Sequence, residues 1–354
     1  MKKKTEVTLE LLQSLPKTDL HCHLDGSLRV ESVIDMARQH NVELPEMTPA
    51  KLKKMLVMGK DCRSLVDYLK AFDITLQVMQ WEDCLERSAY ELALDAHAEN
   101  VVYLEVRYAP CLHLREGLTL QQVNDAVLAG LKRAERETGI ITGVIICGIR
   151  MMPPEESLRL AELAVEYKGK GVVGFDLAGP EANFPAKHHR EGYYLVLDNN
   201  INCTCHAGEA FGPESISQAL HYCGAHRIGH GTRLKENHDL LDYVNDHRIP
   251  LEICPTSNVQ TCAVESMETH PLRFYYDYGL RVTINTDNRL ISDTTVSKEL
   301  LVACQTFNFS LNDVRNLIIH GVKSSFLGYH EKVKLLRRVI SEIDEKCGLR
   351  SDDY

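Results

Sequence analysis

Four side chains suited to binding a metal ion follow short apolar runs that lie far apart in this sequence. They are His21, His23, His206 and Asp287. Neutral imidazoles and one carboxylate suit Zn²⁺, and three His with one Asp leave a further position for water. A lone His is more often a structural or surface residue, but here such side chains recur at several run ends. We therefore expect these residues to form a catalytic metal centre.

The alternation of side chains along a strand explains how two histidines can serve one centre. Successive strand residues point to opposite faces, so His21 and His23 share a face and the apolar residues around them point the other way. The same alternation points His206 inward and turns Cys203 and Cys205 outward. We therefore interpret this Cys-x-Cys pair as a packing feature and not as a metal site.

Two further residues offer acid–base chemistry beside the expected metal. Glu209 lies three residues after His206, close to the centre without being forced into ligation. A reaction with an activated water also needs a proton donor for the substrate, and Glu209 is the best candidate for that general acid. His230 is expected to orient or deprotonate the water, although in its Ile-Gly-His-Gly turn it could instead cap the following segment.

Short apolar and β-branched runs bounded by Gly, Pro or Asp predict eight strands. They span residues 17–24, 101–109, 143–150, 171–177, 201–206, 226–230, 249–254 and 280–286. Segments with helical periodicity lie between them, for example 120–137, 154–168 and 214–223. Strands that alternate with helices predict an α/β fold, a (β/α)8 TIM barrel, in which catalytic groups gather at the carboxyl ends of the strands.

The connection after the first predicted strand is much longer than the others. It runs from about residue 28 to about residue 100 and contains several helical patterns, including 62–79 and 83–98. We expect a helical cap there. Helical spacing recurs at 311–345, and neither a repeat nor a low-complexity linker marks a domain boundary. The chain is therefore predicted to be a single domain over residues 1–354.

The overall composition excludes several classes of protein. Of the 354 residues, 44% are hydrophobic and 25% are charged, which is typical of a globular chain with a sizeable core. A net charge of −10 without a basic stripe opposes binding to nucleic acid or anionic membranes. No run is long enough to span a membrane and the first residues lack an export signal, so we expect a soluble, unexported protein. The 12 cysteines are expected to be reduced, as in a cytoplasm.

Six motifs stand in chain order at the ends of the predicted strands. They are His21-x-His23-Leu24-Asp25-Gly26-Ser27, Asp176-Leu177-Ala178-Gly179, His206-Ala207-Gly208-Glu209, Arg227-Ile228-Gly229-His230-Gly231, Cys254-Pro255-Thr256-Ser257-Asn258 and Asn285-Thr286-Asp287. Together they resemble the motifs of the adenosine deaminase family of metal-dependent amidohydrolases. The surrounding lengths also fit, so the resemblance covers nearly the whole chain.

The resemblance implies a barrel that binds one Zn²⁺ through the four residues already expected to be ligands. It implies that Glu209 shares a proton with purine N1 and that His230 holds the attacking hydroxide. Related dinuclear amidohydrolases carry a carboxylated lysine at the end of strand 4, where this chain has Asp176, so a single metal ion is favoured. The implied reaction is hydrolytic deamination of adenosine, and of 2′-deoxyadenosine, through attack of an activated water at C6.

The same resemblance implies contacts with the substrate. The amide of Gly179 is expected to meet purine N3, and Asp25 the ribose 5′-hydroxyl. His23 and Ser27 belong to the same motif as Asp25 and are also predicted to bind substrate. One position departs from the family pattern Asn-Thr-Asp-Asp, because Asn288 stands last. Since N7 is an acceptor and an Asn amide donates without being protonated, we expect Asn288 to bind N7 and adenosine to remain a substrate.

A hydrophobic gate beside the ribose is a further expectation from the family. The residues that resemble it are Leu65, Tyr68, Leu69 and Phe72. Their helical spacing is equally typical of a helix face packed on a barrel, and the two interpretations are compatible. The pair His188-His189 sits among charged residues in a predicted loop or surface helix, and we assign it no function.

Three alternative functions remain open from the sequence. One is deamination of another 6-aminopurine, such as adenine or an N6-methylated purine nucleotide, although Asp25 favours a ribose contact because related adenine deaminases have Glu there. Another is hydrolysis of phosphoester, lactone or amide bonds on the same barrel. The third is a signalling relative, but such relatives carry an export signal and an added N-terminal region. A cytoplasmic enzyme acting on small purine nucleosides, with a monomer as the default state, is the favoured interpretation.

Overall fold

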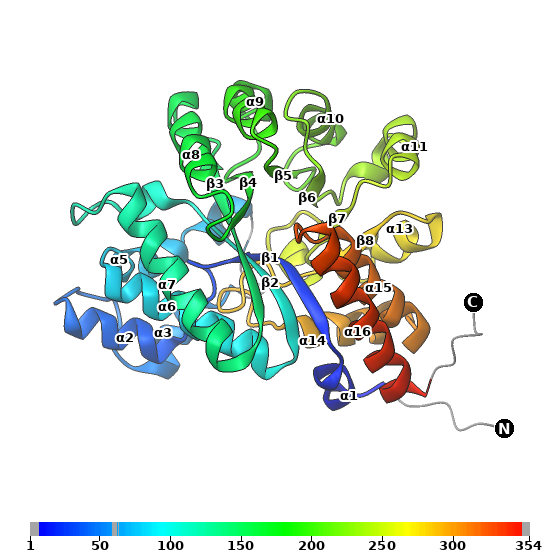
Figure 1. Ribbon diagram of the computed structural model, residues 1–354, viewed down its shortest axis with the longest axis horizontal. Helices are drawn as coiled ribbons and strands as arrows, with labels where there is room; N and C mark the ends of the chain where they lie inside the picture. The colour runs from blue at the N-terminus through cyan, green and yellow to red at the C-terminus, as the bar shows by residue number, and fades with distance from the viewer. Residues whose placement is uncertain (1–6, 59–61, 63, 349–354) are drawn as a thin grey trace.

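The computed structural model describes residues 7–58, 62 and 64–348. Its centre is a sheet of eight parallel strands that pair in chain order (Figure 1). They are β1 (Lys17–His23), β2 (Val101–Tyr108), β3 (Ile141–Ile149), β4 (Val172–Ala178), β5 (Asn202–Ala207), β6 (Arg227–His230), β7 (Leu251–Ile253) and β8 (Val282–Ile284). Each strand overlaps one of the predicted runs.

The barrel closes where the first strand meets the segment after the last one. Cys22 forms a parallel bridge with Asp287. The amide of His23 donates to the carbonyl of Asp287, and the amide of Asp287 donates to the carbonyl of His21, both at 2.7 Å. The predicted (β/α)8 barrel is confirmed, and two expected metal ligands lie at its seam.

Helices surround the strands in Figure 1. Between β1 and β2 lie α2 (Val30–Gln39), α3 (Pro49–Leu56), α4 (Leu65–Leu69), α5 (Phe72–Val78) and α6 (Glu82–Ala98), which form the predicted helical insertion. The other helices are α1 (Leu9–Ser14), α7 (Leu120–Thr138), α8 (Pro154–Glu166), α9 (Arg190–Asp198), α10 (Pro213–His221), α11 (His238–Asp246), α12 (Pro255–Gln260), α13 (Leu272–Tyr278), α14 (Val296–Phe307), α15 (Leu311–Ser324) and α16 (Tyr329–Cys347).

Local sequence accounts for several of these boundaries. Helix α7 begins at a capping box in which Thr119 and Gln122 bond each other's backbone, and it ends at Gly139 with φ +77°. Helix α15 approaches β1 closely, because a Cβ on Gly321 would lie 2.2 Å from Thr18 Oγ1. The absence of a side chain at Gly321 therefore lets α15 pack on the barrel seam.

Buried ion pairs fill the barrel interior below the strand ends. Arg107 lies 2.9 Å from both Asp176 and Glu252, and Arg227 lies 2.6 Å from Glu252 and also pairs with Glu105. All five side chains are at most 1% exposed. Removing one partner would leave a buried charge uncompensated, which typically costs about 3–5 kcal/mol. The network therefore constrains β2, β4, β6 and β7 relative to one another.

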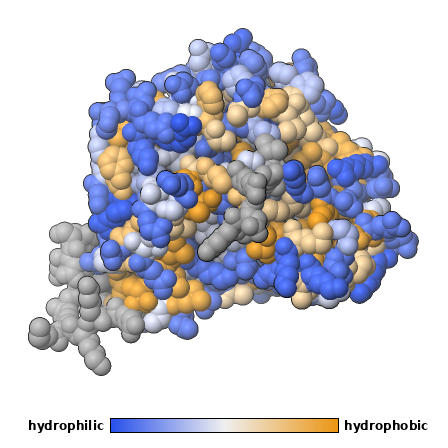
Figure 2. Space-filling model, turned by 180° about the vertical axis from the view of Figure 1, so that it is seen from behind, coloured by the Kyte–Doolittle hydropathy of each residue, from blue (hydrophilic) through white to orange (hydrophobic). Residues whose placement is uncertain are grey.

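The outer surface is of mixed polarity. The face in Figure 2 shows hydrophilic residues interspersed with hydrophobic ones. Across the described ranges, no helix is both long and apolar enough to cross a membrane.

Candidate active site

The four expected metal ligands converge at the carboxyl end of the barrel. Nε2 of His206 lies 3.1 Å from Nε2 of both His21 and His23. Oδ1 of Asp287 lies 3.4 Å from each of the latter two nitrogens. One donor atom from each residue lies within 4.8 Å of the others. The structure therefore brings together residues that are up to 266 positions apart in the chain.

Carboxylates behind two of the rings fix their orientation. His21 Nδ1 donates to Glu252 at 2.8 Å, and His206 Nδ1 donates to Asp176 at 3.0 Å. Burial opposes ionisation of both acids, but His206 and Arg107 hold the pKa of Asp176, and Arg107 that of Glu252, well below the usual range. Because both acids stay ionised as acceptors, the proton of each imidazole resides on Nδ1 and its Nε2 lone pair faces the cluster.

This arrangement fits a bound cation. The Nε2 atoms of His21 and His206 face each other as acceptors, so they cannot hydrogen-bond to each other. Asp287 Oδ2 accepts a hydrogen bond from Ser257 Oγ at 2.5 Å, which leaves Oδ1 directed at the same point. Lone pairs and a carboxylate that converge without a proton between them repel unless a positive ion lies there. The nitrogen and oxygen donors form a largely buried cluster that could hold a metal ion.

The backbone is strained at two residues of the site. His230 has φ +64° and Asp287 has φ +60°, although neither is a glycine. Left-handed conformations at such residues cost about 1–3 kcal/mol and persist where the surrounding structure enforces them. Both residues line one cavity beside the cluster.

A cavity of about 210 Å³ opens beside the metal ligands. From the barrel it is lined by Asp25, Gly179, Glu209, His230 and Asn288, among others. From the helical insertion it is lined by Leu65, Tyr68, Leu69 and Phe72. The residues predicted for acid–base chemistry, for purine contacts and for the gate therefore share one cavity.

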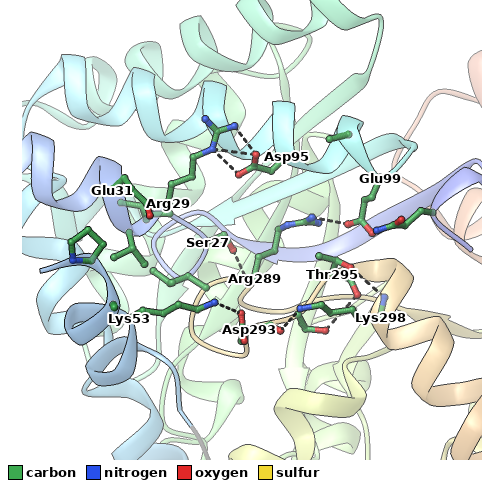
Figure 3. A pocket seen from close by; sticks show the side chains of 18 residues that line it. Ser27, Arg29, Glu31, Lys53, Asp95, Glu99, Arg289, Asp293, Thr295 and Lys298 are labelled. Atoms are coloured by element: carbon green, nitrogen blue, oxygen red, sulfur yellow. Dashed lines mark hydrogen bonds and ion pairs between the residues drawn. The ribbon is translucent and has the colours of Figure 1, made fainter. Parts of the chain in front are cut away.

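Ser27 is the predicted substrate-binding residue that the structure does not bring to this cavity. Its Oγ accepts a hydrogen bond from the amide of Arg289 at 3.0 Å. It lines a separate cavity (Figure 3). Ser27 and the residues after it, up to Glu31, line that cavity, which sequence spacing alone does not reveal.

The separate cavity is larger, about 690 Å³, but it is not the candidate site. Arg29 pairs with Asp95 at 2.6 Å, and Lys53 pairs with Asp293 at 2.9 Å, as the dashed lines in Figure 3 show. These opposite charges neutralise each other. The smaller cavity contains the metal-binding cluster and the strained strand ends, so it is the candidate active site.

Three buried polar atoms in the smaller cavity have no hydrogen-bond partner within the described residues. They are Asp25 Oδ1, Glu209 Oε1 and Asn288 Oδ1. An unpaired buried polar atom costs about 1–3 kcal/mol, so their presence points to a polar ligand. Burial raises the pKa of Asp25 to about 7. Burial also raises the pKa of Glu209 above its usual value, although His230 opposes the rise.

A chain of hydrogen bonds fixes which nitrogen of His230 carries a proton. The amide of Leu272 donates to His270 Nδ1 at 3.0 Å, so the neutral His270 ring carries its proton on Nε2. That Nε2 donates to Asn258 Oδ1 at 3.2 Å, and Asn258 Nδ2 donates to His230 Nδ1 at 2.9 Å. His230 Nε2 therefore carries the proton and points toward Glu209, whose Oε2 lies 3.6 Å away.

Sequence reasoning missed these supporting residues. Ser257 and Asn258 belong to the motif after the seventh predicted strand, so the sequence indicated that they matter but not which site residues they contact. Glu252 lies in β7, and only strand alternation could have placed it inside the barrel. The prediction that His189 lies in a loop or surface helix is wrong about its exposure, since the side chain is buried. Its Nε2 donates to the carbonyl of Arg150 at 3.1 Å, which satisfies the ring inside the protein.

The family comparison agrees with this geometry. The family model for adenosine deaminase matches residues 16–342. The chain belongs to the adenosine deaminase family. The expectation that it is an enzyme of this family is confirmed.

Relatives in sequence and in structure are similar to this protein over most of its chain. An adenosine deaminase of Clostridium kluyveri is 40% identical over 338 residues, covering 95% of this chain and 96% of the relative. A probable adenosine deaminase of Dictyostelium discoideum is 42% identical over 94% of this chain, which spans only 43% of that relative's length. The crystal structure of an Arabidopsis N6-mAMP deaminase has a TM-score of 0.84 and 28% identity, covering 94% of this chain and 99% of that one.

Proposed function

We propose that this adenosine deaminase family member hydrolyses adenosine and 2′-deoxyadenosine to inosine or deoxyinosine and ammonia. The observation that supports it most strongly is a single cavity that combines the metal-binding cluster, the unpaired carboxyl of Glu209 and the Nε2–H of His230. The water oxygen bonds to C6 and the bond from C6 to the amino nitrogen breaks; of the two water protons, one replaces the proton that Glu209 gives to N1 and the other leaves with the amino group as ammonia. The chain contributes both the proton donor and the group that orients the water.

The metal is proposed to be one zinc ion per chain, bound by the three histidines and Asp287. Zinc favours nitrogen ligands with a carboxylate, as in this cluster. When bound, zinc supplies a Lewis acid that lowers the pKa of water to about 7. Asp176 stands where a bridging lysine would support a second ion, and it is already engaged by Arg107 and His206. This supports a site for one ion.

Glu209 is proposed to donate the proton to purine N1. Burial raises the pKa of its carboxyl, which favours the protonated form that can donate. Its Oε1 has no partner within the described chain, so it is available for a ligand. Protonation of N1 neutralises the negative charge that builds up on the ring as water adds to C6.

His230 is proposed to donate a hydrogen bond to the attacking water and not to accept its proton. Its Nδ1 is occupied by Asn258, so Nε2–H is the group that faces the cavity. A donor at this place aligns an oxygen lone pair for attack on C6. The sequence left orientation and deprotonation both open, and the hydrogen-bond chain favours orientation.

The remaining contacts are proposed to select a nucleoside. Asp25 Oδ1 is buried and unpaired in the described chain, which suits a hydroxyl such as the ribose 5′-OH better than a phosphate, since two anions would repel. The Gly179 amide and the Asn288 side chain line the same cavity and would bind purine N3 and N7. Similarity to the N6-mAMP deaminase keeps a methylated nucleotide as the second candidate substrate.

A comparison of substrates tests this selection. Metal-replete protein is assayed with adenosine, 2′-deoxyadenosine, adenine, AMP and N6-methyl-AMP, following ultraviolet absorbance and ammonia release. We expect the highest kcat/KM for the two nucleosides. Preferential turnover of N6-methyl-AMP or adenine would keep the metal chemistry but contradict the role of Asp25.

Cytoplasmic location and a monomeric, single-domain state are also part of this proposal. Buried cysteines such as Cys22, Cys84 and Cys147 are free thiols, as expected in a reducing compartment. The family match spans 327 of the 354 residues without a break, which supports one domain. Sedimentation of the purified protein would check the monomeric state, and one species is expected. Thermal unfolding would check the single domain, and one cooperative transition is expected.

A further inference from the structure

A buried carboxylate outside the proposed reaction holds the loop that carries Glu209. Glu181 follows β4, two residues after Gly179, and is 4% exposed. Four consecutive backbone amides donate to its two oxygens. They are those of Gly208 at 2.6 Å, Glu209 at 2.9 Å, Ala210 at 2.7 Å and Phe211 at 2.9 Å.

The loop backbone is shaped to form this binding site for a carboxylate. Gly208 has φ +71°, and a Cβ there would lie 2.5 Å from Ile216 Cδ1, so the turn depends on glycine. Consecutive amides that converge in this way bind anions strongly, because each hydrogen bond has a charged acceptor. The four donors also compensate the burial of the Glu181 charge.

Contacts from the segment after β6 hold the carbonyl of Gly208 in the same loop. Thr232 Oγ1 donates to the carbonyl of Gly208 at 2.8 Å, and the amide of Arg233 donates to the same carbonyl at 3.1 Å. The side chain of Glu209, by contrast, has His230 as its neighbour at 3.6 Å and an unpaired Oε1 among the described residues. Its direction therefore depends on how the backbone of residues 208–211 is held.

We propose that Glu181 is a positioning residue that fixes the carboxyl of Glu209 against purine N1. Because Glu181 is two residues from Gly179, one segment holds both the amide proposed to meet N3 and the loop that bears the proton donor. Glu181 thereby sets the spacing between two neighbouring purine contacts. This inference rests on the proposed function, since it uses the proposed roles of Glu209 and Gly179.

Substitution Glu181→Gln tests whether the carboxylate of Glu181 holds the backbone of residues 208–211, and it does so without changing side-chain size. Three of the four amides donate to one oxygen and the fourth to the other, so the amide group of Gln must place its N–H bonds against at least one donor. We expect hydrogen exchange of amides 208–211 to accelerate about tenfold, with exchange in α10 unchanged. Unchanged exchange in residues 208–211 would overturn the proposal.

A double-mutant cycle tests whether Glu181 acts through Glu209. We expect Glu181→Gln to lower kcat for adenosine about 100-fold with little change in KM, because small misplacements of a catalytic group have effects of this order. In a Glu209→Gln background the same change should cost less than about threefold, since the group that it positions is gone. An equal loss in both backgrounds would show a general structural role and overturn the proposal.

Controls separate folding from positioning. Glu214→Gln makes the same change at an exposed side chain just after the loop, and kcat should stay at the wild-type value. If Glu181→Gln does not fold, Glu181→Asp keeps the charge on a shorter side chain. It should lower kcat by a smaller factor, and that loss should again shrink in the Glu209→Gln background. Wild-type protein that is inert toward adenosine would contradict the proposed function. Hydrogen exchange of amides 208–211 needs no turnover, so it would still test whether Glu181 holds the loop.

Discussion

At the scale of single residues, the tautomer of His230 decides which kind of hydrogen-bonding group its Nε2 presents to the cavity. The chain from the Leu272 amide through His270 and Asn258 places a proton on His230 Nε2. A backbone N–H starts this chain, and it can only donate. The tautomer of a catalytic group is therefore set by a residue that does not touch the substrate.

Reversing one hydrogen bond in this chain should disable His230. In Asn258→Asp a carboxylate faces His230 Nδ1 and draws the proton there, so Nε2 no longer donates as a neutral group. We expect kcat to fall about 100-fold or more, since the wrong tautomer in comparable sites is very damaging. Asn245→Asp on α11 is the matched control. Retained activity, or a proton found on Nδ1 of His230 by ¹⁵N–¹H NMR of the wild type, would contradict the assignment.

The departure from the family pattern at Asn288 gives a prediction about pH. An Asp at this position can donate to purine N7 only when protonated, and as pH rises it ionises and repels the N7 lone pair. We expect KM of Asn288→Asp to increase with pH, while KM of the wild type varies less. A KM in the variant that does not change with pH would remove this account of Asn288.

At the scale of elements, α4 is tied to the loop after β8. The hydroxyls of Tyr68 and Ser292 lie 2.7 Å apart, and both side chains are buried. The helix that lines the cavity is thus bonded to the loop that follows Asn288. Helical spacing predicted an apolar face here, but the hydroxyl contact depends on a residue 224 positions away.

Removing this hydroxyl should weaken substrate binding more than chemistry. Loss of a buried hydrogen bond costs about 1 kcal/mol, so Tyr68→Phe should raise KM for adenosine roughly fivefold with kcat within about twofold. Ser292→Ala should have a similar effect, and the double variant little more. Tyr222→Phe at an exposed position is the control. Additive effects of the two changes would show that the hydrogen bond between Tyr68 and Ser292 is not the cause of the change in KM.

The elements themselves were largely predictable, and their cross-barrel contacts were not. The predicted run 101–109 matches β2, whose residues are all buried and mostly apolar, as expected of a parallel strand covered on both faces. The metal ligands were predictable because side-chain alternation and strand-end position act locally. Ser27 and Glu181 were not, because loop direction and contacts across strands are set by tertiary packing, which spacing along the chain does not encode.

At the scale of the whole molecule, the metal site ties together the two ends of the barrel sheet. The proposed ligands come from β1, from β5 and from the segment after β8, and β1 meets that last segment at the seam. Binding of an ion to this folded arrangement should therefore stabilise the closed barrel as well as supply the chemistry.

Metal removal should consequently affect both activity and stability. We expect chelation to abolish deamination and to lower Tm by several degrees, and about one equivalent of zinc to restore both. Metal content measured by mass spectrometry gives the stoichiometry. Full activity in protein with less than about a tenth of an equivalent of any metal would contradict a metal-dependent reaction.

The most direct test of the central claim is steady-state turnover of adenosine by zinc-replete protein, compared with Glu209→Gln. The account predicts loss of ultraviolet absorbance with stoichiometric ammonia release in the wild type. It predicts a loss of kcat of at least about 100-fold in the variant, because glutamine cannot supply the proton to N1. An inert wild type, or a variant as active as the wild type, would contradict it.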